Sequence, residues 1–274
     1  GMNPVQAIKM ATINTAKCYG LKHLGAISPG FQADFVVLDN LQDLNVTDVF
    51  YKGKLVDRNA PIRVKTCGRA LKHTVHLDKV KAEQFVLPIG KKKTHVIGIN
   101  PSQITTEDLA VSLQPAANYV PTDGYSKVAA VERHHNTGKI GVAVAKGYGI
   151  RNGAVASSVS HDSHNIIVIG DNDRDMALAV DEIIRTQGGY TVVENGEVFE
   201  TLPLPIMGLM SDAGFESVNE TLGRMIKKAH EMGVPADIEP FITLSFLALP
   251  VIPALRITPR GLCLLTAKGP EILQ

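Results

Sequence analysis

The chain has 274 residues, a formal net charge of +1, a hydrophobic fraction of 45% and a charged fraction of 20%. This length and composition allow one large or two ordinary globular domains with a substantial core. The near-neutral charge, without a sustained basic stripe, argues against a nucleic-acid-binding protein, and no apolar run is long enough for a membrane helix. The three cysteines lie far apart in the sequence, which indicates a reducing, cytoplasmic location rather than a disulfide framework.

The first 56 residues predict a helix followed by a small set of strands. Asn3 can cap a helix that Gly20 can terminate. Strand-like runs follow at 33–39, 48–51 and 54–56. One helix and two or three strands cannot bury a self-sufficient core, so this segment should leave an apolar face that needs a partner surface.

The remainder of the chain, from about residue 69, predicts an α/β or α+β unit built on a mixed sheet. The strand candidates are short apolar runs at 95–99, 127–131, 155–159 and 166–169. One helix is expected from Asn172 to about Gln187, and a second should begin at a capping box formed by Ser217 and Glu220. Asn195-Gly196 predicts a tight hairpin between two further strands.

A polar cluster, His161-Asp162-Ser163-His164-Asn165, joins two of these apolar runs. Loops at the edge of a rigid sheet often carry function. His161 and His164 are three residues apart, so a turn could bring both imidazoles to one metal ion, with Asp162 supplying an oxygen ligand. The alternative is a tight turn in which Asp162 and Asn165 bond the local backbone.

A second polar cluster, Glu132-Arg133-His134-His135, directly follows another strand candidate. If the two strands are neighbours in one sheet, both clusters end at the same edge, less than ~12 Å apart. Together they could form a metal site or a hydrogen-bonding wall for a ligand. The candidate accessory-site residues are Glu132, Arg133, His134, Ser160 and Asn165, and the candidate metal ligands are His161, Asp162 and His164. The structural alternative is a buried network in which Arg133 neutralises Glu132 or Asp162.

Three other stretches are better explained by structure than by chemistry. The glycine-rich segment 138–153 lacks the phosphate-binding patterns, so it predicts close packing or tight turns. The run 171–175 resembles the opening of a calcium loop without the glycine at its sixth position, so it predicts a charged helix N-terminus. The apolar run 246–255 is broken by Pro250 and Pro253 and is expected to be buried core.

Several stretches resemble the amidohydrolase superfamily. In its closing segment a last barrel helix, here Ala11-Thr12-Ile13-Asn14-Thr15-Ala16, precedes a Gly-x-Ile-x-Pro-Gly turn, here 25–30. An Ala-Asp-x-Val-Val strand, here 33–37, then leads into a β-sandwich beside the barrel. Further along, the chain resembles the C-terminal part of the adenine deaminase family, and the matching stretches are 131–134, 147–149, 158–165, 202–211 and 244–253. The family's metal-binding barrel, with its His-x-His pair and later Glu, His and Asp ligands, has no counterpart in this sequence.

The resemblance implies a metal-dependent enzyme that converts adenine and water to hypoxanthine and ammonia, with manganese, iron or zinc in the complete protein. It also implies three parts: residues 1–22 as the last barrel helix, 23–68 as a partial β-sandwich segment, and 69–274 as a C-terminal α/β domain. We therefore expect a truncated portion that is inactive alone and serves as an accessory, active-site-wall or assembly domain. We also expect it to form a homo-oligomer.

Two alternatives remain open at the level of sequence. The chain could be a non-catalytic module that binds a purine or assembles subunits. It could instead be a self-contained enzyme with its own metal site at His161 and His164, and stoichiometric metal on the purified chain would favour that alternative.

Overall fold

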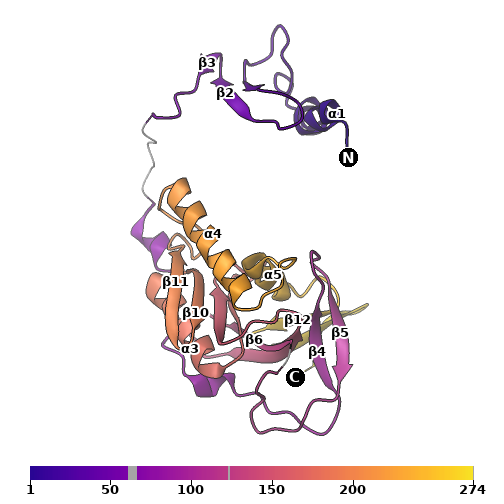
Figure 1. Cartoon of the computed structure of the whole chain (residues 1–274), viewed down its shortest axis with the longest axis vertical. Coiled ribbons are helices and arrows are strands. Elements are labelled where there is room, and N and C mark those ends of the chain that lie inside the picture. The colour runs from indigo at the N-terminus through magenta and orange to yellow at the C-terminus, as the bar shows by residue number, and fades with distance from the viewer. Residues whose placement is uncertain (61–66, 123, 274) are drawn as a thin grey trace. The chain divides into compact units, whose positions relative to one another are not determined.

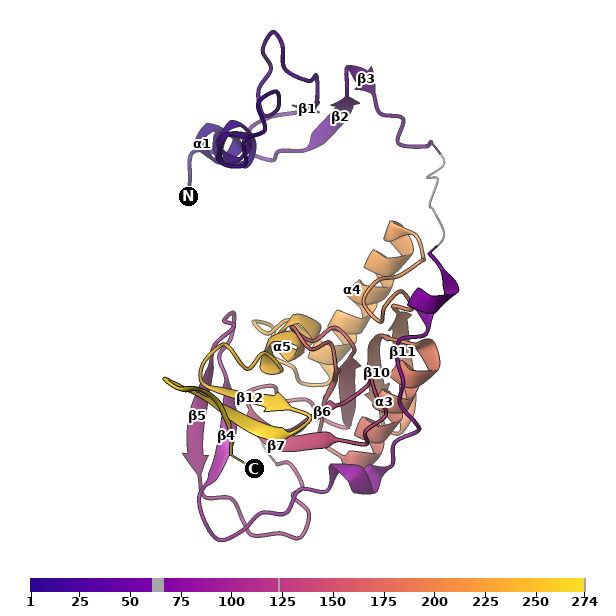
Figure 2. The same cartoon turned by 180° about the vertical axis from the view of Figure 1, so that it is seen from behind.

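The computed structural model describes residues 1–60, 67–122 and 124–273. The chain forms two compact units, Gly1–Lys65 (unit 1) and Thr66–Gln274 (unit 2), drawn in Figures 1 and 2. The end of the expected partial β-segment, at 61–66, lies outside the described residues. Within the described ranges, no helix combines the length and the apolar character needed to cross a membrane.

Unit 1 contains one interrupted helix and a small antiparallel sheet. Its elements are α1 (Pro4–Lys9), the π-helical stretch η1 (Met10–Asn14), α2 (Thr15–Cys18), β1 (Phe35–Leu38), β2 (Val46–Tyr51) and β3 (Lys54–Leu55). The helix begins where expected, because Asn3 Oδ1 accepts hydrogen bonds from the backbone N–H groups of Val5 and Gln6, at 3.0 and 3.3 Å. Gly20, with φ +68°, adopts the left-handed conformation that ends it.

Unit 1 has almost no core of its own. Ala16 is the only fully buried side chain among its described residues. Large apolar side chains lie exposed along it: Met2, Val5, Met10, Tyr19, Leu21, Ile27, Val36, Val37, Leu41, Leu44, Val46, Tyr51, Leu55 and Val56. The expected uncovered apolar surface is therefore present.

Unit 2 is built on a mixed eight-stranded sheet, which confirms the predicted α/β class. The strands are β4 (Thr94–Ile99), β5 (Thr106–Val111), β6 (Tyr125–Val131), β7 (Ile140–Lys146), β8 (Gly153–Ser157), β9 (Ile166–Gly170), β10 (Gly189–Glu194) and β11 (Glu197–Pro203). Their order is β11-β10-β8-β9-β6-β7-β4-β5, and of these neighbours only β4 and β7 run parallel.

The helices and a second small sheet of unit 2 cover both faces of the large sheet. They are η2 (Arg69–Lys72), η3 (Ala82–Phe85), α3 (Asp173–Thr186), α4 (Phe215–Glu231), α5 (Pro240–Leu247), β12 (Leu255–Thr258), β13 (Gly261–Thr266) and β14 (Gly269–Ile272). One face packs against α3 and η3, and the other against α4, α5 and β12–β13 (Figures 1 and 2).

The burial of both faces explains the uninterrupted apolar strands of the sequence. In β9, Ile166 and Val168 join the cluster under α3, whereas Ile167 and Ile169 join the cluster under α4 and α5. Successive side chains of a strand point to opposite faces, so a strand covered on both sides must be apolar at every position.

Two local expectations were wrong in detail. Helix α4 begins at Phe215, with Gly214 as its N-cap, so Ser217 lies inside the helix rather than capping it. The capping preference of serine, about 1 kcal/mol, is small enough for tertiary context to override. The apolar run 246–255 is core only in part, because Leu247 is buried at the end of α5 whereas Val251 is 65% exposed.

The glycine-rich segment contains close packing, as predicted. It includes β7, where a Cβ atom added to Gly141 would lie 2.0 Å from the carbonyl oxygen of Thr258. Only glycine allows the large sheet and the β12–β13 hairpin to approach this closely.

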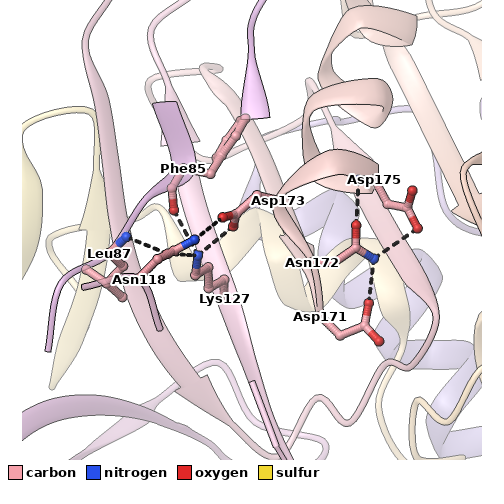
Figure 3. A network of polar contacts seen from close by, with 8 residues as sticks. All are labelled: Phe85, Leu87, Asn118, Lys127, Asp171, Asn172, Asp173 and Asp175. Carbon is pink, nitrogen blue, oxygen red and sulfur yellow. Dashed lines mark hydrogen bonds and ion pairs between the residues drawn. The ribbon is translucent and has the colours of Figure 1, made fainter. Parts of the chain in front are cut away.

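A buried lysine ties β6 to the start of α3 (Figure 3). Lys127 is 1% exposed, and its Nζ lies 2.5 Å from Asp173 Oδ1. The same ammonium group donates to Asn118 Oδ1 at 2.7 Å and to the carbonyl oxygen of Phe85 at 3.1 Å. All three protons of this charge have acceptors, which is the condition under which a buried ammonium group is tolerated.

We predict that Lys127→Met lowers the free energy of unfolding of unit 2 by about 3 kcal/mol, because it leaves the Asp173 carboxylate without its buried partner. Lys79→Met is the matched control, since Lys79 faces Asp181 at 3.5 Å but its side chain is 85% exposed. The control should leave the stability almost unchanged. Urea unfolding measures both variants, and equal losses would contradict the assignment.

Candidate functional site

The pairing of β6 with β9 brings the two polar clusters together. Val131, the last residue of β6, lies opposite Ile166, the first residue of β9. The backbone N–H of Arg133 donates to Asn165 Oδ1 at 3.3 Å, and His134 Nε2 lies 2.8 Å from the carbonyl oxygen of Ser163. The prediction that the clusters share one edge of the sheet is confirmed.

Arg133 lies at the centre of this region and is only 2% exposed. Its guanidinium donates to backbone carbonyl oxygens: Nε to His164, Nη1 to Thr74 at 3.1 Å, and Nη2 to Met207 at 3.0 Å. Nη1 also donates to the Thr74 hydroxyl at 3.3 Å. Burial lowers the pKa of Arg133 to about 10, so the group is still charged at neutral pH.

The expected neutralisation of Arg133 by Glu132 or Asp162 is wrong. Every hydrogen bond that the structure gives the Arg133 guanidinium goes to a carbonyl or hydroxyl oxygen. Asp162 is exposed, and the Glu132 carboxylate is directed to its own turn. The positive charge is therefore stabilised by oriented backbone dipoles rather than by an opposite charge.

Glu132 organises the turn that follows β6. Its carboxylate accepts hydrogen bonds from the backbone N–H groups of His134, His135 and Thr137, at 2.5, 2.9 and 3.1 Å, and from the Thr137 hydroxyl at 3.0 Å. Burial alone would raise the pKa of Glu132, but these hydrogen bonds outweigh it and the pKa is lowered. Glu132 is thus engaged structurally and has little capacity left for a ligand.

The His161–Asn165 segment forms a compact loop against α5. The backbone N–H of His164 donates to the carbonyl oxygen of Ser160 at 2.7 Å, and that of His161 donates to the carbonyl oxygen of Ser245 at 3.1 Å. His164 has φ +49°, a left-handed conformation that is uncommon outside glycine. The His161 ring lies 4.9 Å from the ring of Phe246 and 6.5 Å from that of His164, centroid to centroid.

The side chains of this region include buried polar atoms without partners in the structure. They are Ser160 Oγ, His164 Nδ1 and Ser245 Oγ. An unsatisfied buried group costs about 1–3 kcal/mol, and groups of this kind are therefore rare and call for an explanation. Burial and the charge of Arg133 lower the pKa of His164, so its imidazole is neutral at pH 7 and can either donate or accept.

The metal assignment of His161, Asp162 and His164 stays a prediction. Among the described residues, no group of three or more His, Cys, Asp or Glu side chains is placed to hold a metal ion. A metal bound by these residues would therefore need further ligands from elsewhere.

Several residues of the site were not found from the sequence. Thr74 and Met207 bind Arg133, and Ser245 and Phe246 contact the His161 loop. The stretches 202–211 and 244–253 were part of the family resemblance, and that is the only sequence signal that marked three of these four residues.

Glu132→Gln should weaken the turn after β6 at pH 7, by about 1 kcal/mol, because an amide oxygen accepts more weakly than a carboxylate. Since the folded-state pKa of Glu132 is lowered, its contribution is full above the unfolded pKa and is lost as the pH falls through the folded value. Denaturant unfolding at pH 7 and in the acid range below that pKa measures the effect. A difference between wild type and variant that persisted unchanged into acid would contradict it.

Comparison with known proteins shows the family to which the chain belongs. The model of the adenine deaminase C-terminal domain matches residues 103–268, and the model of the amidohydrolase family matches residues 1–56. An adenine deaminase of Desulfitobacterium hafniense is 52% identical over 96% of this chain and 46% of its own length. Those of Nitratidesulfovibrio vulgaris and Clostridium acetobutylicum are 46% and 41% identical, over 96% and 95% of this chain and 47% of their own lengths. The chain spans about half the length of these curated relatives, and it belongs to the adenine deaminase family.

Proposed function

We propose that this chain is part of a metal-dependent aminohydrolase that converts adenine and water to hypoxanthine and ammonia, and that unit 2 supplies one wall of its active site. The observation that carries the proposal is the loop of residues 160–165. It places unpartnered polar atoms of Ser160 and His164 at the sheet edge next to the second polar cluster. The curated relatives named adenine deaminase support the choice of reaction.

The reaction needs more than the described residues provide. Hydrolytic deamination requires an activated water, and a divalent ion such as manganese, iron or zinc would supply it by lowering the pKa of bound water. The donor set described above does not fit such a centre, since no three ligand side chains among the described residues are placed together. We therefore assign the metal chemistry to the portion of the relatives that this chain does not match.

The wall itself has the chemistry to bind a purine edge. The partly exposed His164 imidazole is neutral and can donate or accept a hydrogen bond, and a purine presents donors and acceptors side by side. The half-buried rings of His161 and His164, with Phe246 behind His161, add planar apolar surface. Asn165 lies buried next to Arg133 and supports the loop rather than the ligand.

Unit 1 would belong to the catalytic domain of the complete protein. In this proposal residues 1–22 are its last barrel helix and residues 23–68 a partial β-sandwich, followed by the C-terminal domain at 69–274. The match to the amidohydrolase family over residues 1–56 supports the assignment, as do the exposed apolar side chains and the single buried residue, Ala16, among the described residues of unit 1. Cytoplasmic location and assembly into a homo-oligomer complete the proposal.

The 274-residue chain should release no ammonia from adenine when manganese, iron or zinc is added. The same chain joined in frame to the N-terminal portion of the Desulfitobacterium hafniense relative should turn over at an ordinary enzyme rate, about 1–10³ per second. An ammonia assay decides both arms. Turnover at such a rate by the chain alone would show that it holds a complete active site.

In the joined protein, His164→Ala should lower kcat/KM about 10²-fold, the size of effect expected when one preorganised hydrogen-bonding group is removed. His95→Ala is the control, since His95 is half-exposed on β4 and pairs with Asp108 at 2.8 Å, outside the loop. Thermal unfolding of both variants is measured in parallel. Losses of activity that merely follow the losses of stability would favour a purely structural loop.

A further inference from the structure

Three segments that are far apart in the sequence converge on the guanidinium of Arg133. Thr74 lies before η3, His164 lies in the loop between β8 and β9, and Met207 lies in the turn after β11. Each segment presents a backbone carbonyl oxygen to a different nitrogen of the same side chain. Because the guanidinium is planar and its N–H groups point in fixed directions, it determines both the direction and the hydrogen-bond distance at which each carbonyl oxygen must lie.

The turn after β11 is shaped to fit against this guanidinium. Gly208 has φ +71°, and a Cβ atom added there would lie 2.6 Å from Arg133 Nη1 and 2.9 Å from Cζ. On its other side the Gly208 carbonyl accepts the Ser158 hydroxyl at 2.6 Å, and Ser158 Oγ in turn accepts the Gly189 N–H at 2.8 Å. The turn is thus held between Arg133 and the end of β8.

We propose that Arg133, Gly208 and Ser158 form a positioning unit that holds the loop of residues 160–165 in its observed conformation. The inference rests on the proposed function in one respect, since the loop is the wall that the unit would position for deamination. Arg133 itself is a positioning residue: it contacts the loop through the carbonyl of His164 and has no exposed surface for a substrate.

Of the hydrogen bonds that Arg133 donates, the one to the His164 carbonyl oxygen contacts the loop of residues 160–165 directly. His164 adopts a left-handed conformation, which persists in a non-glycine residue only where the surroundings determine it. Its N–H is fixed by Ser160 and its carbonyl by Arg133. Without the guanidinium, the carbonyl would lose the partner that orients it, and local opening of the loop would become easier.

Arg256, which lies in unit 2 but outside the positioning unit, provides a matched control. It is also fully buried, its pKa is likewise lowered by burial to about 10, and it donates to the carbonyl oxygens of Ile252, Ile104 and Pro253 at 2.7–2.8 Å. None of these partners belongs to residues 160–165 or to the turn at Gly208. Its substitution should cost comparable global stability without releasing the loop.

The experiment is amide hydrogen exchange, resolved by residue, on the 274-residue chain and its variants. Arg133→Gln should speed exchange of the His164 amide at least tenfold more than it speeds exchange in the centre of β9. Gly208→Ala should do the same by displacing the guanidinium, and Arg133→Lys should restore part of the protection by keeping a donor near the His164 carbonyl. Arg256→Gln should change the loop and β9 equally.

Equal changes in the loop and in β9 for the Arg133 and Gly208 variants would overturn the proposal. So would selective release of the loop by Arg256→Gln. If Arg133→Gln does not fold, Gly208→Ala still decides the matter, because it must release the loop selectively. The result is independent of the deamination assay: an inactive joined protein would contradict the proposed function, whereas the exchange pattern alone tests the positioning unit.

Discussion

A buried positive charge that has no carboxylate partner among the described residues, that of Arg133, is the constraint on which the arrangement of this site depends. Moving a guanidinium out of water is expensive, and the chain compensates by directing carbonyl oxygens from three segments at Arg133. The compensation is geometric as well as energetic, because those carbonyls can reach Arg133 only when the segments lie in one arrangement. The same arrangement of the three segments therefore both stabilises the buried charge and sets the shape of the site.

The large sheet makes that requirement possible. β6 and β9 are central strands buried on both faces, and the close packing of their side chains holds the ends of both strands in place. Lys127 fixes the opposite end of β6 by binding Asp173 at the start of α3. The two polar clusters lie in the loops at the end of these fixed strands.

The sequence predicted the elements whose signals are local. The apolar runs of β6 and β9, the cap of α3 at Asn172 and the Asn195-Gly196 hairpin all follow from short-range patterns, and the structure contains each of them. The meeting of the two polar clusters was also predictable, because both directly follow or precede buried strands. The prediction that the clusters meet required only that the two strands pair with each other in one sheet.

The rest depends on information that local patterns do not carry. Arg133 binds backbone carbonyls, and since every residue has one, nothing in the sequence marks His164, Thr74 or Met207 as its partners. α5 is apolar all round and has no amphipathic period, so its approach to His161 through Ser245 could not be foreseen. The expected ion pair of Arg133 is absent because the Glu132 carboxylate accepts hydrogen bonds from backbone N–H groups of its own turn, and local sequence patterns do not predict these bonds.

The proposed function requires the loop of residues 160–165 to face a bound purine in the complete protein. A crystal structure of the joined protein with bound hypoxanthine tests it most directly. We predict a polar atom of this loop within hydrogen-bonding distance of the purine, about 3 Å. A purine bound with no atom of residues 160–165 in contact would contradict it.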